Sequence, residues 1–417
     1  MSQPPDDPKT RDLPAGLRLV DGGVTAAPGF RAGNTACGIK TEPGAPDMAL
    51  LLADRECDVA ATFTTSQTAS HTIAVCRDHL QRSRHRTQAV IINSGNANCS
   101  NGARGLDDAI RMTALAAARL GLDPTKVLVS STGIIGRPLP MDKIERGIAQ
   151  IEARPDGGHD FARGIMTTDT RPKTVAVEFD VQGKTVRLGG STKGVGMIYP
   201  NMATMLCYLT TDAAVAPDEL QAVMKRAVDD SFNMVCVDGD MSTNDSAFLF
   251  ASGGAGNEPL REGGPGADVF EAALRYVTRT LGREMARDGE GAKKLMTVRV
   301  RGGATDAGAR RAARAITNSD IWKCAVAGGD PNWGRIISTL GASGATLDHD
   351  RLEIGIGGVT LVKDGVAADY DQAAAKRAMA GAEVEIDIHL HLGDHEATAW
   401  GCDLTYGYID ENATYTR

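Results

Sequence analysis

The stretch TQAVIINSGNANCSNG (residues 87–102) gives the clearest indication of how this chain is built. Residues 89–92 are a run of apolar, β-favouring side chains, which predicts a buried strand. The asparagine, glycine and serine residues that follow predict a loop. An amphipathic segment then covers residues 106–120 and stops at Gly121, which predicts a helix that ends in a glycine cap.

The same order of elements comes again directly afterwards. Residues 127–130 predict a second buried strand, and the sequence STGIIG (131–136) predicts a turn. Two prolines then precede a predicted helix over residues 141–152. Strand, loop, helix, strand, turn and helix is the order of a layered α/β fold, so we predict that class.

The rest of the chain continues this alternation. The sequence TVAVEFDVQGKTVRLGG (174–190) predicts a hairpin that turns at Gln182-Gly183. Helices are predicted over residues 218–229 and 269–283. In EVEIDIHLHLGD (383–394), strict alternation places Ile386, Ile388, Leu390 and Leu392 on one face of a strand. No linker marks a domain boundary, although 417 residues predict two or three packed units.

Composition excludes several classes of protein. A net charge of -8 argues against a general nucleic-acid or anionic-membrane binder. No apolar run reaches the roughly 18 residues of a membrane helix. Residues 1–16 lack the apolar region of a signal peptide and predict a disordered polar tail, so we expect a cytoplasmic protein that binds neither nucleic acid nor membrane.

Neither the cysteines nor the loop motifs predict a metal or nucleotide site. The eight cysteines include no C-x-x-C pair, which predicts free thiols. The sequence GGSTKGVGM (189–197) lacks the spacing of a phosphate-binding loop. A calcium loop beginning at Asp238 would need glycine where Thr243 stands and glutamate where Leu249 stands. His389 and His391 alternate with the apolar face of their strand, which predicts solvated side chains and no metal ligands.

The sequence YPNMATMLCYLTTDA (199–213) allows two interpretations. Thr204 precedes a run of strand-forming residues, so its hydroxyl could merely satisfy the start of a strand. Alternatively, Thr204 Oγ attacks the carbonyl of Ala203 and breaks the Ala203-Thr204 bond. The freed α-amine, with an ordinary pKa of about 7.7–8.0, could then act as the base for the hydroxyl of the same residue. This stretch alone leaves both interpretations open.

Other motifs favour the second interpretation. The chain resembles the ornithine acetyltransferases, also called glutamate N-acetyltransferases, of arginine biosynthesis. The resemblance includes KGVGMIYPNMATML, which is similar to the self-cleavage segment of that family, and it covers nearly the whole chain except the N-terminal tail. The further matching blocks, in chain order, are GFRAGNTACGIK (29–40), NSGNAN (93–98), STGIIG (131–136), TTDTRPK (167–173), STND (242–245), DGEGAKK (288–294), DPNWGR (330–335) and WGCDLT (400–405).

The resemblance implies a fold, a cleavage site and an assembly. The implied fold is the layered α/β sandwich of the self-cleaving family, with a smaller C-terminal α/β unit. The threonine of the cleavage segment is the acetyl-carrying nucleophile in the family, and Thr204 stands at that position. Cleavage would leave an α chain of residues 17–203 after the tail and a β chain of residues 204–417. Two copies of each chain, α2β2, are also implied.

The resemblance further implies roles for individual residues. Thr132 and Gly133 match the pair that forms the oxyanion hole, although without the resemblance they would indicate an ordinary turn. Departures from the family pattern affect two places. The family often has Asn-Ala-Cys-Thr-Gly where this chain has NCSNG (98–102), and it usually ends in a hydroxyl residue where this chain has arginine. The matched substrate contacts are Thr167, Lys193, Thr204, Glu290 and Asn412. Arg417 stands where the family has the hydroxyl residue, and as a cation that can pair a carboxylate it is a candidate substitute in substrate binding.

The reaction implied by the resemblance is transfer of an acetyl group from N2-acetyl-L-ornithine to L-glutamate through acetyl-Thr204. Exchange of one amide for another requires no ATP, metal or organic cofactor. Use of acetyl-CoA as a second acetyl donor stays open. The alternatives are a self-cleaving amidase or aminopeptidase, in which water replaces glutamate, and a non-catalytic binding protein, which the catalytic-type residues disfavour.

Overall fold

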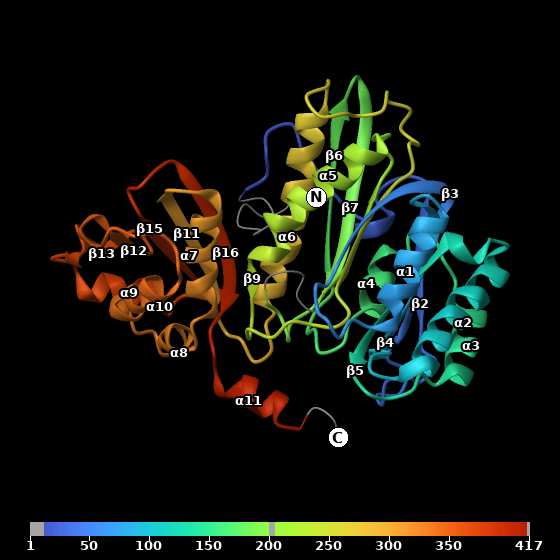
Figure 1. Ribbon diagram of the computed structural model, residues 1–417, viewed down its shortest axis with the longest axis horizontal. Coiled ribbons are helices and arrows are strands. Elements are labelled where there is room, and N and C mark those ends of the chain that lie inside the picture. Colours follow the sequence, from blue (N-terminus) through green and yellow to red (C-terminus); the bar gives the residue numbers. More distant parts are fainter. Residues whose placement is uncertain (1–11, 200–204, 415–417) are drawn as a thin grey trace. The chain divides into compact units, whose positions relative to one another are not determined.

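A computed structural model describes residues 12–199 and 205–414. These residues divide into two compact units. Unit 1 contains residues 12–194, 205–228 and 242–281, and unit 2 contains residues 195–199, 229–241 and 282–414 (Figure 1). Helix α6 (Ala267–Arg287) contributes its first part to unit 1 and its last part to unit 2.

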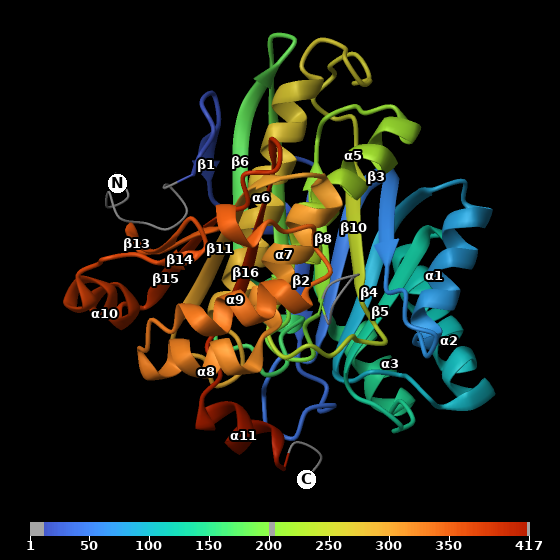
Figure 2. The ribbon, with the colours of Figure 1, turned by 60° about the vertical axis from the view of Figure 1, so that its left-hand side comes forward.

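Unit 1 is built on a nine-stranded sheet in the order β1-β6-β7-β8-β10-β3-β4-β5, with β2 paired to β3 (Figure 2). Strands β8 and β10 are parallel, as are β4 and β5, whereas the other neighbours are antiparallel. The strands are β1 (Arg18–Val20), β2 (Phe30–Thr35), β3 (Met48–Phe63), β4 (Arg86–Asn96), β5 (Val127–Ile134), β6 (Lys173–Val181), β7 (Lys184–Lys193), β8 (Leu206–Thr211) and β10 (Ser246–Ala251).

The helices of unit 1 cover this sheet. Helices α1 and α2 pack against β5 and against each other, α3 packs against α2, and α4 packs against β2 and β3. Their apolar sides join the strand residues in one core, in which Ile91, Ile92, Val129 and Phe161 are fully or almost fully buried. The helices are α1 (His71–Arg82), α2 (Gly102–Leu120), α3 (Met141–Gln150), α4 (Gly158–Gly164), α5 (Pro217–Asp229), η1 (Gly23–Thr25) and η2 (Pro124–Lys126).

The predicted strand-helix-strand unit is present as β4, α2 and β5, with corrected ends. The strands extend beyond residues 92 and 130 because the polar residues after them continue the ladder, pairing Asn93 with Ser131 and Ser94 with Thr132. Helix α2 begins at Gly102 rather than at residue 106, because the end of a helix depends on loop contacts that apolar periodicity does not report. It ends at Gly121, whose φ of 68° confirms the predicted glycine cap.

The predicted hairpin is confirmed by β6 and β7. Gln182 and Gly183 form its turn with φ values of 51° and 74°, the left-handed conformations of a tight two-residue turn. The helix predicted over residues 218–229 is α5, and the helix predicted over residues 269–283 is the longer α6.

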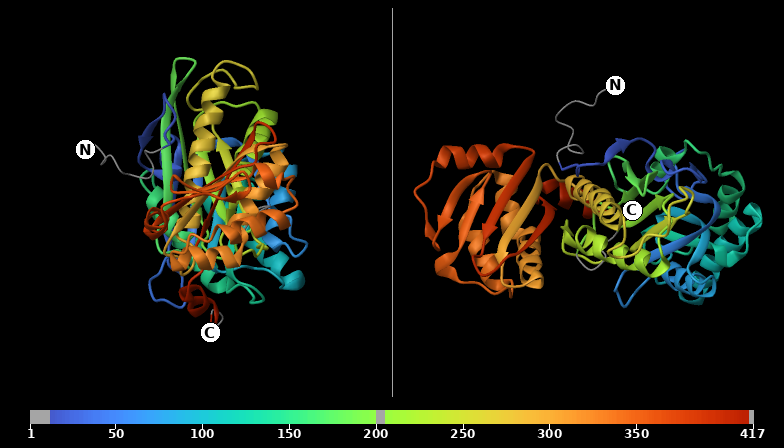
Figure 3. Two further views of the ribbon diagram at one scale, coloured as in Figure 1. Left: turned by 90° about the vertical axis from the view of Figure 1, so that its left-hand side faces the viewer. Right: turned by 90° about the horizontal axis from the view of Figure 1, so that it is seen from above.

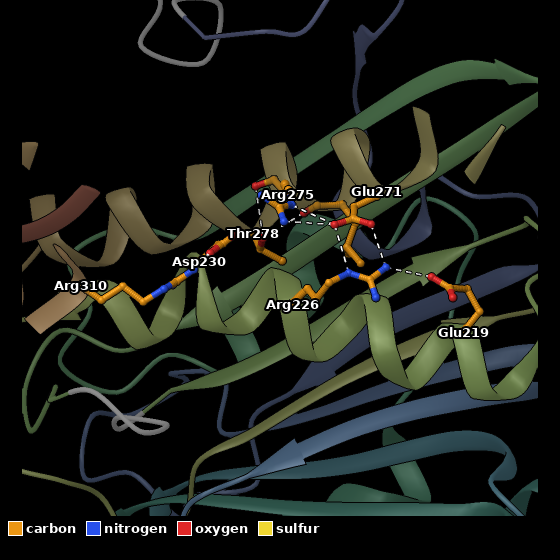
Figure 4. Close-up of polar contacts among 8 residues, drawn as sticks. Glu219, Arg226, Asp230, Glu271, Arg275, Thr278 and Arg310 are labelled. Carbon is orange, nitrogen blue, oxygen red and sulfur yellow. Dashed lines mark hydrogen bonds and ion pairs between the residues drawn. The ribbon is translucent and has the colours of Figure 1, made fainter. Parts of the chain in front are cut away.

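Helices α5 and α6 are joined by a bidentate ion pair. Figure 4 shows Arg226 of α5 reaching Glu271 of α6, with Nε–Oε1 at 3.2 Å and Nη2–Oε2 at 2.8 Å. Arg226 Nη2 also lies 2.9 Å from Glu219 Oε1. All three side chains are partly exposed, so the stabilisation is about 1 kcal/mol.

Unit 2 is built on a seven-stranded sheet in the order β14-β13-β12-β15-β11-β16-β9 (Figure 3). Helix α7 (Asp306–Asn318) packs against β11 and β16. The strands are β9 (Val235–Cys236), β11 (Leu295–Gly303), β12 (Glu353–Ile356), β13 (Val359–Lys363), β14 (Val366–Ala367), β15 (Glu383–His389) and β16 (His395–Cys402). The other helices are α8 (Asp320–Gly328), α9 (Trp333–Ala342), α10 (Gln372–Ala380), α11 (Tyr406–Asn412), η3 (Phe232–Met234) and η4 (His349–Arg351).

The predicted alternation near the C-terminus is confirmed over most of its length. Ile386, Ile388 and Leu390 are buried, but the strand ends at His389 and Leu392 is only half-buried. The rings of His389 and His391 are half-buried and stack on each other with their centroids 3.7 Å apart.

Both units combine helices with a sheet, and unit 2 is the smaller, so the predicted α/β class with a smaller C-terminal unit is confirmed. Two predictions stay predictions. One is the pair of chain ends at residues 203 and 204, and the other is the disordered tail, of which only residues 12–16 are described. All eight cysteines are free thiols, as predicted. No helix in the described ranges is long and apolar enough to span a membrane.

Candidate active site

The turn that carries Thr132 and Gly133 is the end of β5, beside β4. Thr132 pairs with Ser94 and Gly133 with Gly95 across the parallel ladder. Gly133 has a φ of 131°, and a Cβ added there would lie 2.3 Å from the carbonyl carbon of Gly95. Only glycine fits this conformation and this contact, so Gly133 allows the backbone conformation next to Thr132.

Buried asparagine side chains form hydrogen bonds that hold this turn. Asn244 Nδ2 donates to the carbonyl oxygens of Ala97 (2.6 Å) and Ser131 (2.8 Å). Ser131 Oγ donates to Asn93 Oδ1 at 2.6 Å, and Asn93 Nδ2 donates to the carbonyl of Asn96 at 2.8 Å. These bonds join NSGNAN, STGIIG and STND, three of the motifs singled out in the sequence, into one rigid support.

Lys193 lies beside this turn. It ends β7, it is only 2% exposed, and its Nζ donates to Thr132 Oγ1 at 3.3 Å. Lys193 is therefore a buried lysine and not a solvated surface side chain. Burial of a lysine costs free energy unless negative or polar groups surround the ammonium, so its position indicates a function beyond solubility.

Asp169 supplies the negative charge near Lys193. Asp169 Oδ1 accepts hydrogen bonds from Lys173 Nζ (2.7 Å) and from the N–H of Gly194 (2.9 Å), and Oδ2 accepts from the N–H of Thr167 (3.1 Å). Burial raises the pKa of Asp169, but Lys173, Lys193 and these bonds outweigh it and lower the pKa to about 2. The carboxylate therefore stays ionised and connects the Thr167 segment to the end of β7.

A second buried carboxylate lies directly after the proposed cleavage site. Asp245 Oδ1 accepts a hydrogen bond from the N–H of Met205 at 2.9 Å, and the carbonyl of Met205 accepts one from the N–H of Ser246 at 3.1 Å. Burial raises the pKa of Asp245 well above its usual range, although Met205, Ser242 and Lys193 act in the opposite direction. Met205 is covalently bonded to Thr204, so Asp245 fixes the backbone one residue beyond the predicted nucleophile.

Unit 2 brings two further predicted residues together. Asn412 Nδ2 donates to Glu290 Oε2 at 2.9 Å, although 122 positions separate the two residues. Glu290 is 8% exposed, and a Cβ at Gly196 would lie 2.2 Å from Glu290 Oε2. The carboxylate therefore packs on Gly196, the second glycine of KGVGM, and no larger residue fits there.

The C-terminal segment is held by the turn that carries Glu290. Thr405 caps α11, and its hydroxyl donates to the carbonyl of Gly291 at 2.6 Å. A Cβ at Gly291, whose φ is 68°, would lie 2.1 Å from the backbone nitrogen of Tyr408. Residues 406–412 therefore form a helix held against the Glu290 turn.

Asp238 holds the chain before the proposed cleavage site. Its two carboxylate oxygens accept hydrogen bonds from the N–H groups of Met197 (2.5 Å) and Ile198 (2.8 Å), and Tyr408 Oη donates to Oδ2 at 3.3 Å. Burial raises the pKa of Asp238, whereas the backbone N–H donors lower it. Asp238 is thus a local backbone anchor rather than the first ligand of a calcium loop.

The structure thus places the predicted site residues in two groups. Thr132, Gly133, Thr167 and Lys193 meet in unit 1, and Glu290 and Asn412 meet in unit 2. Ala203, Thr204 and Arg417 lie outside the described residues. Sequence reasoning missed the carboxylates of Asp169 and Asp245, although they stand in the motifs TTDTRPK and STND, and it considered Asp238 only as the first ligand of a calcium loop.

Comparisons with known proteins identify the family. The ArgJ family model matches residues 31–417. The arginine biosynthesis bifunctional protein ArgJ of Symbiobacterium thermophilum is 46% identical over 402 residues, covering 96% of this chain and 100% of that protein. The protein of the same name from Thermus thermophilus is 47% identical over 388 residues, covering 93% and 98%. A crystal structure of the Bacillus halodurans protein is 39% identical, covers 49% of this chain and 97% of that chain, and has a TM-score of 0.48. The chain belongs to the ArgJ family.

This membership confirms the predicted class of enzyme. The chain is an acyltransferase, with glutamate N-acetyltransferase function in arginine biosynthesis. The amidase or aminopeptidase alternative is not favoured, because the relatives that match nearly the whole chain are biosynthetic proteins.

Proposed function

We propose that Thr204 is the nucleophile of this acetyltransferase and that it becomes active by self-cleavage. Thr204 Oγ attacks the Ala203 carbonyl carbon, the Ala203-Thr204 C–N bond breaks, and the nitrogen takes up a proton. Water then hydrolyses the resulting ester to the Ala203 carboxylate and the Thr204 hydroxyl. The free α-amine of Thr204 serves as the base for the hydroxyl in later turnovers.

Two half-reactions of one kind follow. Thr204 Oγ attacks the acetyl carbonyl of N2-acetyl-L-ornithine, the amide C–N bond breaks, and ornithine leaves with the proton from the hydroxyl. The α-amine of glutamate then attacks acetyl-Thr204 and releases N-acetylglutamate with restoration of the threonine. Each step passes through a tetrahedral oxyanion, which needs preorganised donors.

The contact between Lys193 and Thr132 is the observation that best supports this proposal. An ammonium group donates hydrogen bonds and cannot accept one, so Thr132 Oγ1 must be the acceptor in that contact. The proton of the Thr132 hydroxyl then remains available to an oxyanion, with the N–H of Gly133 as the second donor. Loss of one such donor costs about 2.7–4 kcal/mol of transition-state stabilisation.

The remaining matched residues suit recognition of amino acids. The buried Glu290 carboxylate suits the ammonium group of a substrate, and the amide of Asn412 orients that carboxylate. Lys193 and Arg417 offer cations for substrate carboxylates, and Thr167 is half-buried beside Asp169. Apart from that of Arg417, which stands where the family has a hydroxyl residue, these assignments rest on the matched motifs together with the contacts in each unit.

We extend the proposal to the setting of the enzyme. Amide exchange requires no metal or organic cofactor, and acetyl-CoA would enter as a second acetyl donor. We propose a cytoplasmic α2β2 assembly of the α and β chains. The α2β2 assembly is what the family pattern implies.

Two measurements test the proposal. Intact-mass analysis of the denatured protein should give chains of residues 1–203 and 204–417, and Thr204→Ala should remain one inactive chain. A Thr204→Ala protein that still splits at this bond contradicts the mechanism. Acetylornithine alone should add one acetyl group to the β chain, and later addition of glutamate should yield N-acetylglutamate. Release of acetate in its place would favour the amidase.

A further inference from the structure

Unit 2 contains a pocket of about 470 Å³ that none of the site residues above lines. Helices α7 and α9 supply most of its wall, and Tyr199 supplies another part. The volume lies within the range of about 300–1,000 Å³ that is typical of sites for small molecules.

The charge of this pocket is entirely positive. Arg311 and Arg314 line it, and no aspartate or glutamate is among its lining residues. The neighbouring Arg310 is neutralised by ion pairs with Asp230 and Asp306. By contrast, the guanidinium of Arg314 makes no ion pair or hydrogen bond within the described ranges, and that of Arg311 donates only to a backbone carbonyl, at 2.9 Å.

Arg314 is also partly removed from water. Burial lowers the pKa of Arg314, and Arg310 and Arg311 act in the same direction. Tyr199 and Asp229 act in the opposite direction, but the carboxylate of Asp229 already accepts a hydrogen bond from Asn233 at 2.9 Å. A half-buried cation without a carboxylate partner is unfavourable by itself, and an added anion would compensate it.

The hydroxyl groups of the pocket add to this preference. Ser343 Oγ donates to the carbonyl of Leu340 and Thr339 Oγ1 donates to Ser319 Oγ. Ser338 also lines the pocket, and within the described ranges its hydroxyl has no protein partner. Arg311, Arg314 and Ser338 thus offer donors to a ligand in the pocket. Planar guanidinium groups match the paired oxygens of a carboxylate or a phosphate.

We propose that this pocket binds a small organic anion, whose carboxylate or phosphate group is held by Arg314 and Arg311 with Ser338 as an additional donor. The half-buried ring of Tyr199 forms a wall against the remainder of the ligand. The proposal is independent of the acetyl-transfer mechanism, since it uses none of the residues assigned to that mechanism.

The test is calorimetric titration of the purified full-length protein with inorganic phosphate in one arm and malonate in the other. We expect saturable binding of at least one anion, and the tighter arm identifies the oxyanion. Arg314→Gln should weaken that binding about tenfold or more, as expected for loss of a charge-assisted contact. Arg377→Gln is the matched control, because Arg377 is an exposed arginine of unit 2 whose partner, Asp371, is exposed as well. It should bind as wild type does.

A second measurement uses the wild-type protein alone, in case Arg314→Gln does not fold. Phenylglyoxal modifies accessible arginines, and peptide mass spectrometry locates the modified residue. Saturating phosphate or malonate should slow the modification of Arg314 and leave that of Arg377 unchanged. Absence of saturable binding by both anions, equal binding by Arg314→Gln, or unprotected Arg314 would each overturn the proposal.

Discussion

Replacement of Asp169 by asparagine tests whether the buried charges of unit 1 stabilise its fold. The side chains of Asp169 and Lys173 are both fully buried, and their charged atoms lie 2.7 Å apart. A neutral amide at this position would remove the negative charge that the buried Lys173 ammonium contacts. Removal of one partner of a buried ion pair typically costs about 3–5 kcal/mol in the free energy of unfolding.

The pKa of Asp169 also indicates how much its charge stabilises the fold and how that stabilisation depends on pH. A folded-state pKa of about 2 against an ordinary value of 3.8 corresponds to about 2 kcal/mol of stabilisation. Because the folded-state pKa is lowered, this stabilisation is complete above the unfolded-state value and is lost as the pH falls toward 2. The difference in stability between wild type and Asp169→Asn should therefore shrink between about pH 5 and pH 2.

The assay is urea unfolding at several pH values, followed by circular dichroism. Asp142→Asn is the matched control, because Asp142 and Arg146 form a pair of the same i,i+4 spacing that is mostly exposed. That control should lose less than about 1 kcal/mol. The double variant Asp169→Asn/Lys173→Met should recover part of the loss, since it removes the buried cation together with the carboxylate. If Asp169→Asn is as stable as Asp142→Asn at pH 7, the argument from buried charge is refuted.

Three further predictions concern the site. Gly133→Ala should lower kcat by about a hundredfold or more, because its Cβ would lie 2.3 Å from the Gly95 carbonyl carbon and displace an oxyanion donor; wild-type kcat would contradict this. Asn412→Ala should raise KM for glutamate or acetylornithine while the two chains still form, because the variant removes the amide that hydrogen-bonds to Glu290 Oε2; unchanged steady-state kinetics would remove Asn412 from the site. Asp238→Asn should slow chain separation on denaturing gels, because one of its two backbone contacts before the cut loses its acceptor; a wild-type rate would show that the anchor is dispensable.

The sequence by itself determined the features that depend on neighbouring residues. Apolar runs and alternation predicted the strand-helix-strand order around residues 87–102, and Gln182-Gly183 predicted the hairpin turn. These predictions held because periodicity and turn conformation are properties of a few consecutive residues. The ordered set of motifs also identified the family before any contact was known.

The tertiary structure alone decided the contacts between distant segments. Nothing in the local sequence shows that Lys193 is buried against Thr132, 61 positions away, or that Asn412 reaches Glu290. The tertiary structure also showed that Asp169 and Asp245 accept hydrogen bonds from the backbone at or next to the predicted residues. Local patterns could not give these facts, because a buried charge is tolerated only where other segments supply its partners, and chain folding alone brings those partners together.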